Sequence, residues 1–270
     1  MSENERGIAV VTGASSGIGL ATARALLRDG YRVYGTSRKP MPDTADGIAM
    51  LVCDVTDDAS VRSAVDGVLR RAGRIDLLVN NAGIGVTGAA EESSIAQVRS
   101  LFETNFHGVV RVTNAVLPVM RRQGAGRILN VGSALGFIPA PYNAYYSATK
   151  HALEGYSESL DHEVRGFGVR VAVIEPAATR TSFEGSTVPS DRPLADYDES
   201  RAKYLVAYER TMAGADTAED VAATIALAAR DKNPRLRYPS GKVARQGAFA
   251  RRFLPRSFFD KTLHKQFGLA

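Results

Sequence analysis

Residues 7–38 read GIAVVTGASSGIGLATARALLRDGYRVYGTSR, and this stretch decides the fold. The apolar run at 7–12 predicts a buried strand, and 31–36 predicts a second one. Between them, 18–28 carries apolar residues at helical spacing, and a glycine-rich turn precedes it. Strand, turn, helix and strand in this order are typical of two parallel strands joined by a crossover helix.

The same alternation continues along the chain. We expect further strands at 48–53, 75–80, 127–131, 169–174 and 236–238, and helices at 57–71, 95–122, 142–165 and about 198–210. Right-handed crossovers would arrange these elements as an α/β fold. The prediction is a single-domain, doubly wound (Rossmann-type) parallel sheet of about seven strands, with helices on both faces and ligands at the carboxyl ends of the strands.

The chain of 270 residues has no composition break that would mark a linker. We therefore expect one dinucleotide-binding and catalytic domain over 1–240, a substrate lid at about 182–212, and an extension over 241–270 packed on the same domain. With Cys53 as the single cysteine and four histidines, we expect no disulfide and no metal site. Neither a secretory leader nor a membrane-spanning run is evident, so a cytoplasmic location is expected.

The positive charge is concentrated at one end. The formal net charge is +5, yet residues 235–270 contain nine Lys or Arg and one acid, Asp260. One basic segment without a nucleic-acid-binding motif does not predict a nucleic-acid partner. The segment also carries aromatic residues, including Phe249, Phe253 and Phe267. Two interpretations stay open: weak contact with an anionic membrane surface, or packing on the same domain or on a partner subunit.

The turn after the first strand is suited to a phosphate group. It reads Thr12-Gly13-Ala14-Ser15-Ser16-Gly17-Ile18-Gly19, with glycines that permit a tight turn and a close backbone approach. The helix start would offer N–H groups to a pyrophosphate. After the second strand, Ser37 and Arg38 stand where an acid would bind the ribose of NAD. This favours NADP(H) over NAD(H), with Arg38 on the 2′-phosphate, although a solvated charge at a strand end is the alternative.

Tyr146 and Lys150 lie four residues apart in a helical segment, so both side chains share one face. An ammonium one turn away favours the phenolate, so Lys150 is expected to lower the Tyr146 pKa. Thirteen residues before Tyr146, Ser133 follows a strand end and could donate a hydrogen bond to a substrate oxygen. Together these residues suit proton exchange with a carbonyl or an alcohol.

The chain resembles the short-chain dehydrogenase/reductase family. The residues that carry the resemblance, in the family's order over about residues 7–240, are Thr12 to Gly19, Asn80 to Gly83, Asn105, Ser133, Tyr146 with Lys150, and Pro176 to Thr181. The segment at 175–184 and the extended tail are similar to the hydroxysteroid and retinol dehydrogenase branch. The pattern departs from the family at Gly132, where a serine is usual, and at Ala177, where a glycine is usual.

The resemblance implies roles for these residues. Tyr146 is the general acid/base, Lys150 binds the nicotinamide ribose, and Ser133 orients the substrate oxygen. Asn105 holds a water that links Lys150 to solvent. Asp54 meets the adenine, Asn81 the adenosine side, and Thr181 the carboxamide. The full set of expected cofactor contacts is Gly13, Ser15, Ser16, Gly17, Ile18, Gly19, Ser37, Arg38, Asp54, Val55, Asn81, Ala82, Gly83, Tyr146, Lys150, Pro176, Thr179 and Thr181.

The branch resemblance suggests a bulky, apolar secondary alcohol or ketone, steroid-like or retinoid-like. Its expected contacts are Ser133, Leu135, Phe137, Tyr142, Tyr146 and Phe183, with plain packing as the alternative for 135–142. Family members commonly associate through the helices expected at 105–122 and 142–165, so a homodimer or homotetramer is expected.

Two other functions stay open. The same site could reduce a polar or sugar-type carbonyl, although sugar-nucleotide relatives usually need a longer substrate domain. The fold could also serve as a non-catalytic NADP-binding redox sensor. A sensor needs no proton donor beside the nicotinamide, so the complete set of Asn105, Ser133, Tyr146 and Lys150 favours an enzyme.

Overall fold

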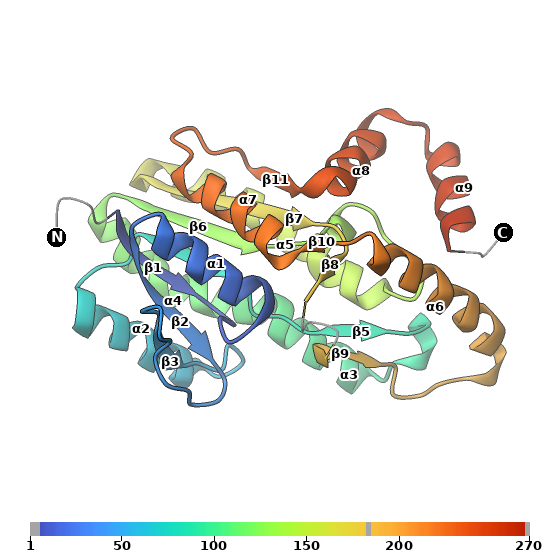
Figure 1. Ribbon diagram of the computed structural model, residues 1–270, viewed down its shortest axis with the longest axis horizontal. Helices are drawn as coiled ribbons and strands as arrows, with labels where there is room; N and C mark the ends of the chain where they lie inside the picture. Colours follow the sequence, from blue (N-terminus) through green and yellow to red (C-terminus); the bar gives the residue numbers. More distant parts are fainter. Residues whose placement is uncertain (1–5, 182–184, 268–270) are drawn as a thin grey trace.

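A computed structural model describes residues 6–181 and 185–267. Its central feature is a parallel sheet of seven strands in the order β3-β2-β1-β4-β6-β7-β11 (Figure 1). The strands are β1 (Gly7–Val11), β2 (Tyr31–Ser37), β3 (Ala49–Val52), β4 (Leu77–Asn80), β6 (Gly126–Val131), β7 (Val169–Pro176) and β11 (Arg237–Ser240). The predicted doubly wound sheet is confirmed, and every predicted strand is present within a few residues of its expected bounds.

Helices cover both faces of the sheet (Figure 1). One face carries α2 (Asp58–Ala72), α4 (Gly108–Gln123) and α5 (Ala144–Val164), and the other carries α1 (Gly17–Arg28) and α7 (Ala218–Arg230). In β1 the buried side chains alternate, with Ile8 and Val10 facing the first set and Ala9 and Val11 facing the second. A strand buried on both faces must be apolar throughout, which explains the unbroken apolar run.

Several elements are additional to the prediction. The helix α7 begins with a capping box in which Thr217 and Asp220 bond to each other's backbone, a signal visible in the sequence. Two small sheets pair β5 (Gly85–Thr87) with β9 (Thr187–Pro189) and β8 (Thr179–Arg180) with β10 (Asp216–Thr217). Strands of two or three residues carry too little periodicity to be predicted.

The helix expected at 95–122 consists of three parts. α3 (Ile95–Phe102) and α4 are joined by one π-helical turn over Glu103–His107. Such turns contain one extra residue and occur often at functional sites. The predicted helix is thus confirmed, and the irregular turn falls on Asn105.

The chain after β11 forms two helices, α8 (Gly241–Phe253) and α9 (Arg256–Gln266). They extend from the β11 edge of the sheet towards α6 (Asp198–Ala213) (Figure 1). α8 places Ala244 in a buried position, and Phe267, after α9, stacks on Tyr204 of α6 with 5.7 Å between ring centroids. Within the described residues, no helix is both long and apolar enough to span a membrane.

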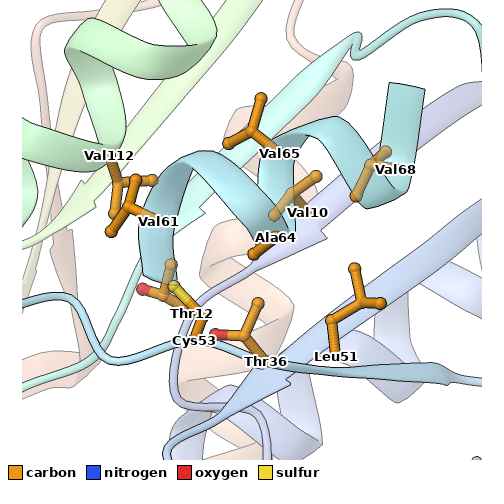
Figure 2. Close-up of a pocket in the computed structure, with 10 residues that line it drawn as sticks. All are labelled: Val10, Thr12, Thr36, Leu51, Cys53, Val61, Ala64, Val65, Val68 and Val112. Carbon is orange, nitrogen blue, oxygen red and sulfur yellow. The ribbon is translucent and has the colours of Figure 1, made fainter. Parts of the chain in front are cut away.

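Beneath α2 lies a small cavity of about 10 Å³ (Figure 2). Aliphatic side chains form most of its wall, and Thr12, Thr36 and Cys53 gather at one end. Burial raises the pKa of Cys53 to about 11, so the thiol stays protonated and unreactive at neutral pH. With space for about one water, the cavity is a packing gap in the core.

Candidate active site

The glycine-rich turn between β1 and α1 has the shape that a pyrophosphate requires. Gly13 and Gly17 have φ angles of 65° and 54°, in the left-handed region that favours glycine. A Cβ on Gly19 would lie 2.2 Å from the Gly13 carbonyl oxygen, so only glycine fits there. The first turn of α1 contains no acidic residue. The turn therefore fits a dinucleotide phosphate at a helix N-terminus.

Asn81 fastens this turn to β4. Its amide nitrogen donates to the carbonyl oxygens of Thr12 at 2.9 Å and Gly13 at 3.1 Å. The Thr12 hydroxyl in turn accepts from the main-chain nitrogens of Asn81 and Ala82. The Asn81 amide is thus used to hold the glycine turn, and its contact with the adenosine side of a cofactor stays a prediction.

The end of β2 presents a cation next to the end of β3. Arg38 is exposed, and its positive charge contributes to lowering the pKa of Asp54. The larger causes are two hydrogen bonds from Thr56 to the Asp54 carboxylate, from the main-chain nitrogen at 2.9 Å and the hydroxyl at 2.7 Å. Ser37 accepts from Lys39 N at 3.3 Å. Arg38, Ser37 and Asp54 therefore lie at the same edge, as the sequence predicts.

Asn105 lies in the π-helical turn and is 1% exposed. Its side chain accepts from Ile84 N and donates to Ile84 O, both at 2.9 Å, and it donates to the Thr149 hydroxyl at 3.4 Å. The side-chain amide therefore bridges the segment after β4 to α5. The side-chain amide is bonded to protein atoms, so only the main chain of Asn105 could hold the expected water. That role of Asn105 stays a prediction.

Ser133, Tyr146 and Lys150 come together at the carboxyl end of β6. Ser133 hydrogen-bonds to the Tyr146 hydroxyl, and its Oγ accepts from Leu135 N at 3.1 Å. Lys150 Nζ lies 5.5 Å from the centre of the Tyr146 ring and donates to Val131 O at 2.9 Å. Helix α5 provides Tyr146 and Lys150 from one face, so the predicted juxtaposition is present.

The pKa of Tyr146 is shifted opposite to the prediction. Burial raises it to about 12 despite the hydrogen bond with Ser133, and nearby Tyr208 raises it further. Burial also lowers the pKa of Lys150 to about 8, against the opposing effect of Glu154. The predicted lowering of the Tyr146 pKa is wrong, because desolvation is the largest cause of the shift and Lys150 is not among its causes. The raised pKa favours the protonated phenol.

The segment after β7 lies beside the same edge. Pro176 ends β7, and Thr179 in β8 donates from its hydroxyl to Ala177 O at 3.0 Å. The short pairing of β8 with β10 fixes this segment. Thr181 is the last described residue before the gap at 182–184, so the predicted substrate contact Phe183 lies outside the described residues.

The predicted apolar contacts divide into two groups. Leu135 and Phe137 are partly buried at the turn after Ser133. Tyr142 has a φ angle of 60°, a strained conformation for a residue with a side chain. Its hydroxyl lies 2.5 Å from Ser200 Oγ, and its ring lies 4.8 Å from the Tyr204 ring. Tyr142 is therefore packed against α6, which lies in the segment predicted as a substrate lid.

Sequence reasoning missed the contribution of α6. Ser200, Tyr204 and Tyr208 lie four residues apart on this helix. The Ser200 hydroxyl and the Tyr204 ring contact Tyr142, and Tyr208 is close enough to Tyr146 to raise the Tyr146 pKa. This spacing places side chains on one helix face and was available in the sequence. Tyr142, Tyr204 and Tyr208 together form an aromatic wall, and Tyr208 is its member near Tyr146.

Comparison with known proteins agrees with this geometry. Residues 7–191 match the short chain dehydrogenase family. The 3-ketodihydrosphingosine reductase of Bacteroides thetaiotaomicron is 40% identical over 238 residues, covering 87% of this chain and 88% of that protein. Retinol dehydrogenase 8 of Bos taurus is 38% identical over 189 residues, covering 65% and 60%. A Streptomyces avermitilis short-chain dehydrogenase has 34% identity and a TM-score of 0.83, with 97% of each chain covered.

The chain therefore belongs to the short-chain dehydrogenase family. It is an oxidoreductase, as the sequence predicts. Solved relatives hold NAD in one case and NADP+ in another, so membership alone does not select between the two cofactors.

Proposed function

We propose that the protein is an NADP(H)-dependent reductase that converts a bulky apolar ketone into a secondary alcohol, with the reverse oxidation available. The observation that carries this proposal is the Ser133–Tyr146 hydroxyl pair beside Lys150. A bound nicotinamide would supply the hydride. Tyr146, neutral because burial raises its pKa to about 12, would donate a proton to the oxygen, and Ser133 would stabilise the developing charge.

Arg38 supports the choice of NADP(H). It stands exposed at the end of β2, with Ser37 beside it and no acidic residue at 35–39. A guanidinium is suited to a 2′-phosphate by charge-assisted hydrogen bonds. A carboxylate at this place would instead favour the ribose hydroxyls of NAD(H).

The aromatic wall supports an apolar substrate. Tyr142, Tyr204 and Tyr208 stack in sequence, with ring centroids 4.8 Å and 6.1 Å apart. Leu135 and Phe137 lie just after Ser133 and are partly buried. Two relatives are named for 3-ketodihydrosphingosine and for retinol. Their names support a ketone on a long or bulky hydrocarbon as the substrate class. A polar, sugar-type carbonyl would gain less from such a wall.

The tail supports weak contact with an anionic membrane surface. Helix α8 packs through small residues, since Ala244 is buried and a Cβ on Gly247 would lie 2.8 Å from Ile138 Cδ1. Its large apolar side chains face outwards, with Phe249 64% and Phe253 63% exposed. Basic residues surround them, and Arg252 lies over the Phe253 ring. Two copies of so basic a tail would repel each other, whereas acidic lipids would attract it.

Co-sedimentation with vesicles tests this contact. Vesicles containing a phosphatidylserine fraction should retain the protein at low salt, and purely zwitterionic vesicles should not. A variant with Phe249→Glu and Phe253→Glu should lose retention while keeping the turnover of a water-soluble ketone. Equal recovery of the wild type and this variant from both vesicle types would remove the membrane from the proposal.

The remaining parts of the proposal are a cytoplasmic location and a homodimer or homotetramer formed through α4 and α5. A free, buried Cys53 suits a reducing compartment. Light scattering from the purified protein measures the assembly, and a monomer at micromolar concentration would contradict it.

The deciding experiment is the oxidation of NADPH and NADH over a panel of ketones from small aliphatic to long-chain and steroid. We expect turnover with NADPH and a bulky apolar ketone, and its loss in Tyr146→Phe. Tight NADPH binding without turnover across the panel would favour the redox-sensor alternative. Turnover confined to sugar-type carbonyls would support the proposed carbonyl reduction but contradict the proposed apolar substrate class.

A further inference from the structure

Two glutamates are buried together behind the active site. Glu154 lies one helical turn after Lys150 on α5 and is 7% exposed, and Glu175 lies near the end of β7 and is 1% exposed. Neither takes part in the chemistry proposed above. Buried carboxyl groups at this depth need a partner for each charge.

One cation serves both carboxyl groups. Arg237 of β11 places Nε 2.8 Å from Glu154 Oε2 and 3.7 Å from Glu175 Oε1, and its Nη2 bonds to Glu158 at the surface. Among the described residues, Arg237 is the one cation within 4 Å of either carboxyl group, so at contact distance it compensates only one of two negative charges if both glutamates are ionised. Burial raises the pKa of both, that of Glu175 to about 8, and the Glu175 carboxyl group donates a hydrogen bond to Glu154.

The unpaired oxygen of this cluster is consistent with a shared proton. Glu154 Oε1 is buried and receives no hydrogen from any N–H or hydroxyl donor among the described residues. A proton held between the two carboxyl groups would satisfy it, as in other pairs of acids that cannot both ionise. One proton, two glutamates and Arg237 then form a cluster without net charge.

The cluster lies directly behind the catalytic segment. A Cβ on Gly132 would lie 3.3 Å from Glu154 Oε1 and 2.6 Å from Val173 Cγ1. The side chains of Val173 and Glu154 thus explain why a glycine stands where the family usually has a serine. Gly132 follows Val131, whose carbonyl oxygen accepts from Lys150, and precedes Ser133.

We propose that Glu154 and Glu175 share one proton, and that Glu154 is a positioning residue whose remaining negative charge keeps Lys150 an ammonium during the reaction. The second half rests on the proposed function; the first does not. The charged or titratable groups that act on the pair are Lys150, His151 and Glu158 on α5 and Arg237 on β11. Among them, Glu154 acts on Lys150 against the effect of burial.

Infrared spectroscopy of the intact protein tests the shared proton. Wild type near pH 6.5 should show the C=O stretch of a buried, protonated carboxylic acid, and this band should disappear above pH 9. Glu175→Gln should remove the band at pH 6.5, because the amide can donate to an ionised Glu154. Glu158→Gln, which also alters an Arg237 partner, should retain it. A missing wild-type band, or a band unchanged in Glu175→Gln, would overturn the pairing.

The pH dependence of kcat for ketone reduction tests the effect on Lys150. Glu154 lies one helical turn from Lys150, and removing a nearby opposite charge lowers an ammonium pKa by about one unit. Glu154→Gln should therefore move the alkaline loss of kcat down by about one pH unit, with kcat near pH 6 retained. Glu175→Gln should keep the wild-type kcat up to about pH 7, where glutamine replaces the protonated member.

The outcomes separate the two proposals. A Glu154→Gln profile that coincides with wild type after scaling would overturn the role of Glu154, because a purely structural loss lowers kcat equally at every pH. A wild type that reduces no ketone would remove the proposed function and with it the second half of this proposal. The infrared result would then still decide whether the proton is shared.

Discussion

Replacing Glu175 by glutamine should abolish a pH dependence of folding stability that the wild type carries. A carboxyl group whose folded pKa is raised binds its proton more tightly in the folded than in the unfolded chain. Its stabilising contribution is therefore complete below pH 4.5 and is lost as the pH rises towards 8. At 1.36 kcal/mol per pH unit, the rise from 4.5 to about 8 sets an upper limit of about 5 kcal/mol.

Urea unfolding followed by circular dichroism at pH 5, 6, 7 and 8 measures this term. The free energy of unfolding of wild type minus that of Glu175→Gln should fall steadily across the series, by several kcal/mol in total. Taking the difference cancels the other titrating groups that both proteins share. Glu158→Gln, at a half-exposed position on the same arginine, should run parallel to wild type. Parallel curves for Glu175→Gln would refute the reasoning, because Glu175 would then titrate alike in both states.

Three further changes test the site. Tyr146→Phe should lower kcat by about 100-fold or more and leave NADPH affinity nearly unchanged, since it removes the proton donor alone. If steady-state kinetics showed more than a tenth of wild-type turnover, another group would be the proton donor. Arg38→Asp should lower the ratio of kcat/KM for NADPH to that for NADH by about 10- to 100-fold, the worth of a charge-assisted hydrogen bond, and an unchanged ratio would place the phosphate elsewhere. Gly19→Ala puts a methyl group 2.2 Å from the Gly13 carbonyl oxygen, so a fluorescence titration should find NADPH binding lost; wild-type affinity would mean that the turn yields.

The sequence predicted those features that local pattern controls. Apolar-rich segments alternating with helical patterns predicted the seven strands, and the order of Asn105, Ser133, Tyr146 and Lys150 predicted the candidate site. The sign of the Tyr146 pKa shift could not be predicted in the same way. Four-residue spacing puts Lys150 beside Tyr146, but the balance between its charge and desolvation depends on distant elements such as α6 and β7.

Other features were within reach of the sequence and were missed. Tyr204 and Tyr208 lie one turn apart on a helix within the predicted lid at about 182–212, so their common face could have been predicted to contact Tyr142 and Tyr146. The pairing of Glu154 with Glu175 could not be predicted from the sequence, because it depends on how helix α5 packs on strand β7. Such contacts follow from the fold and leave no periodic mark on either segment.

The π-helical turn at Glu103–His107 sets the rotational phase between α3 and α4. Each residue turns an α-helix by about 100°. One inserted residue therefore lets α3 and α4 follow each other directly even though their buried faces point in different directions. Deleting one residue here would restore a regular helix and rotate Val112 and Val116 away from the sheet if α3 stayed in place. Single-residue deletions in this segment should therefore be far less tolerated than substitutions at its exposed position, His107. Asn105 thus occupies a turn in which chain length itself is constrained.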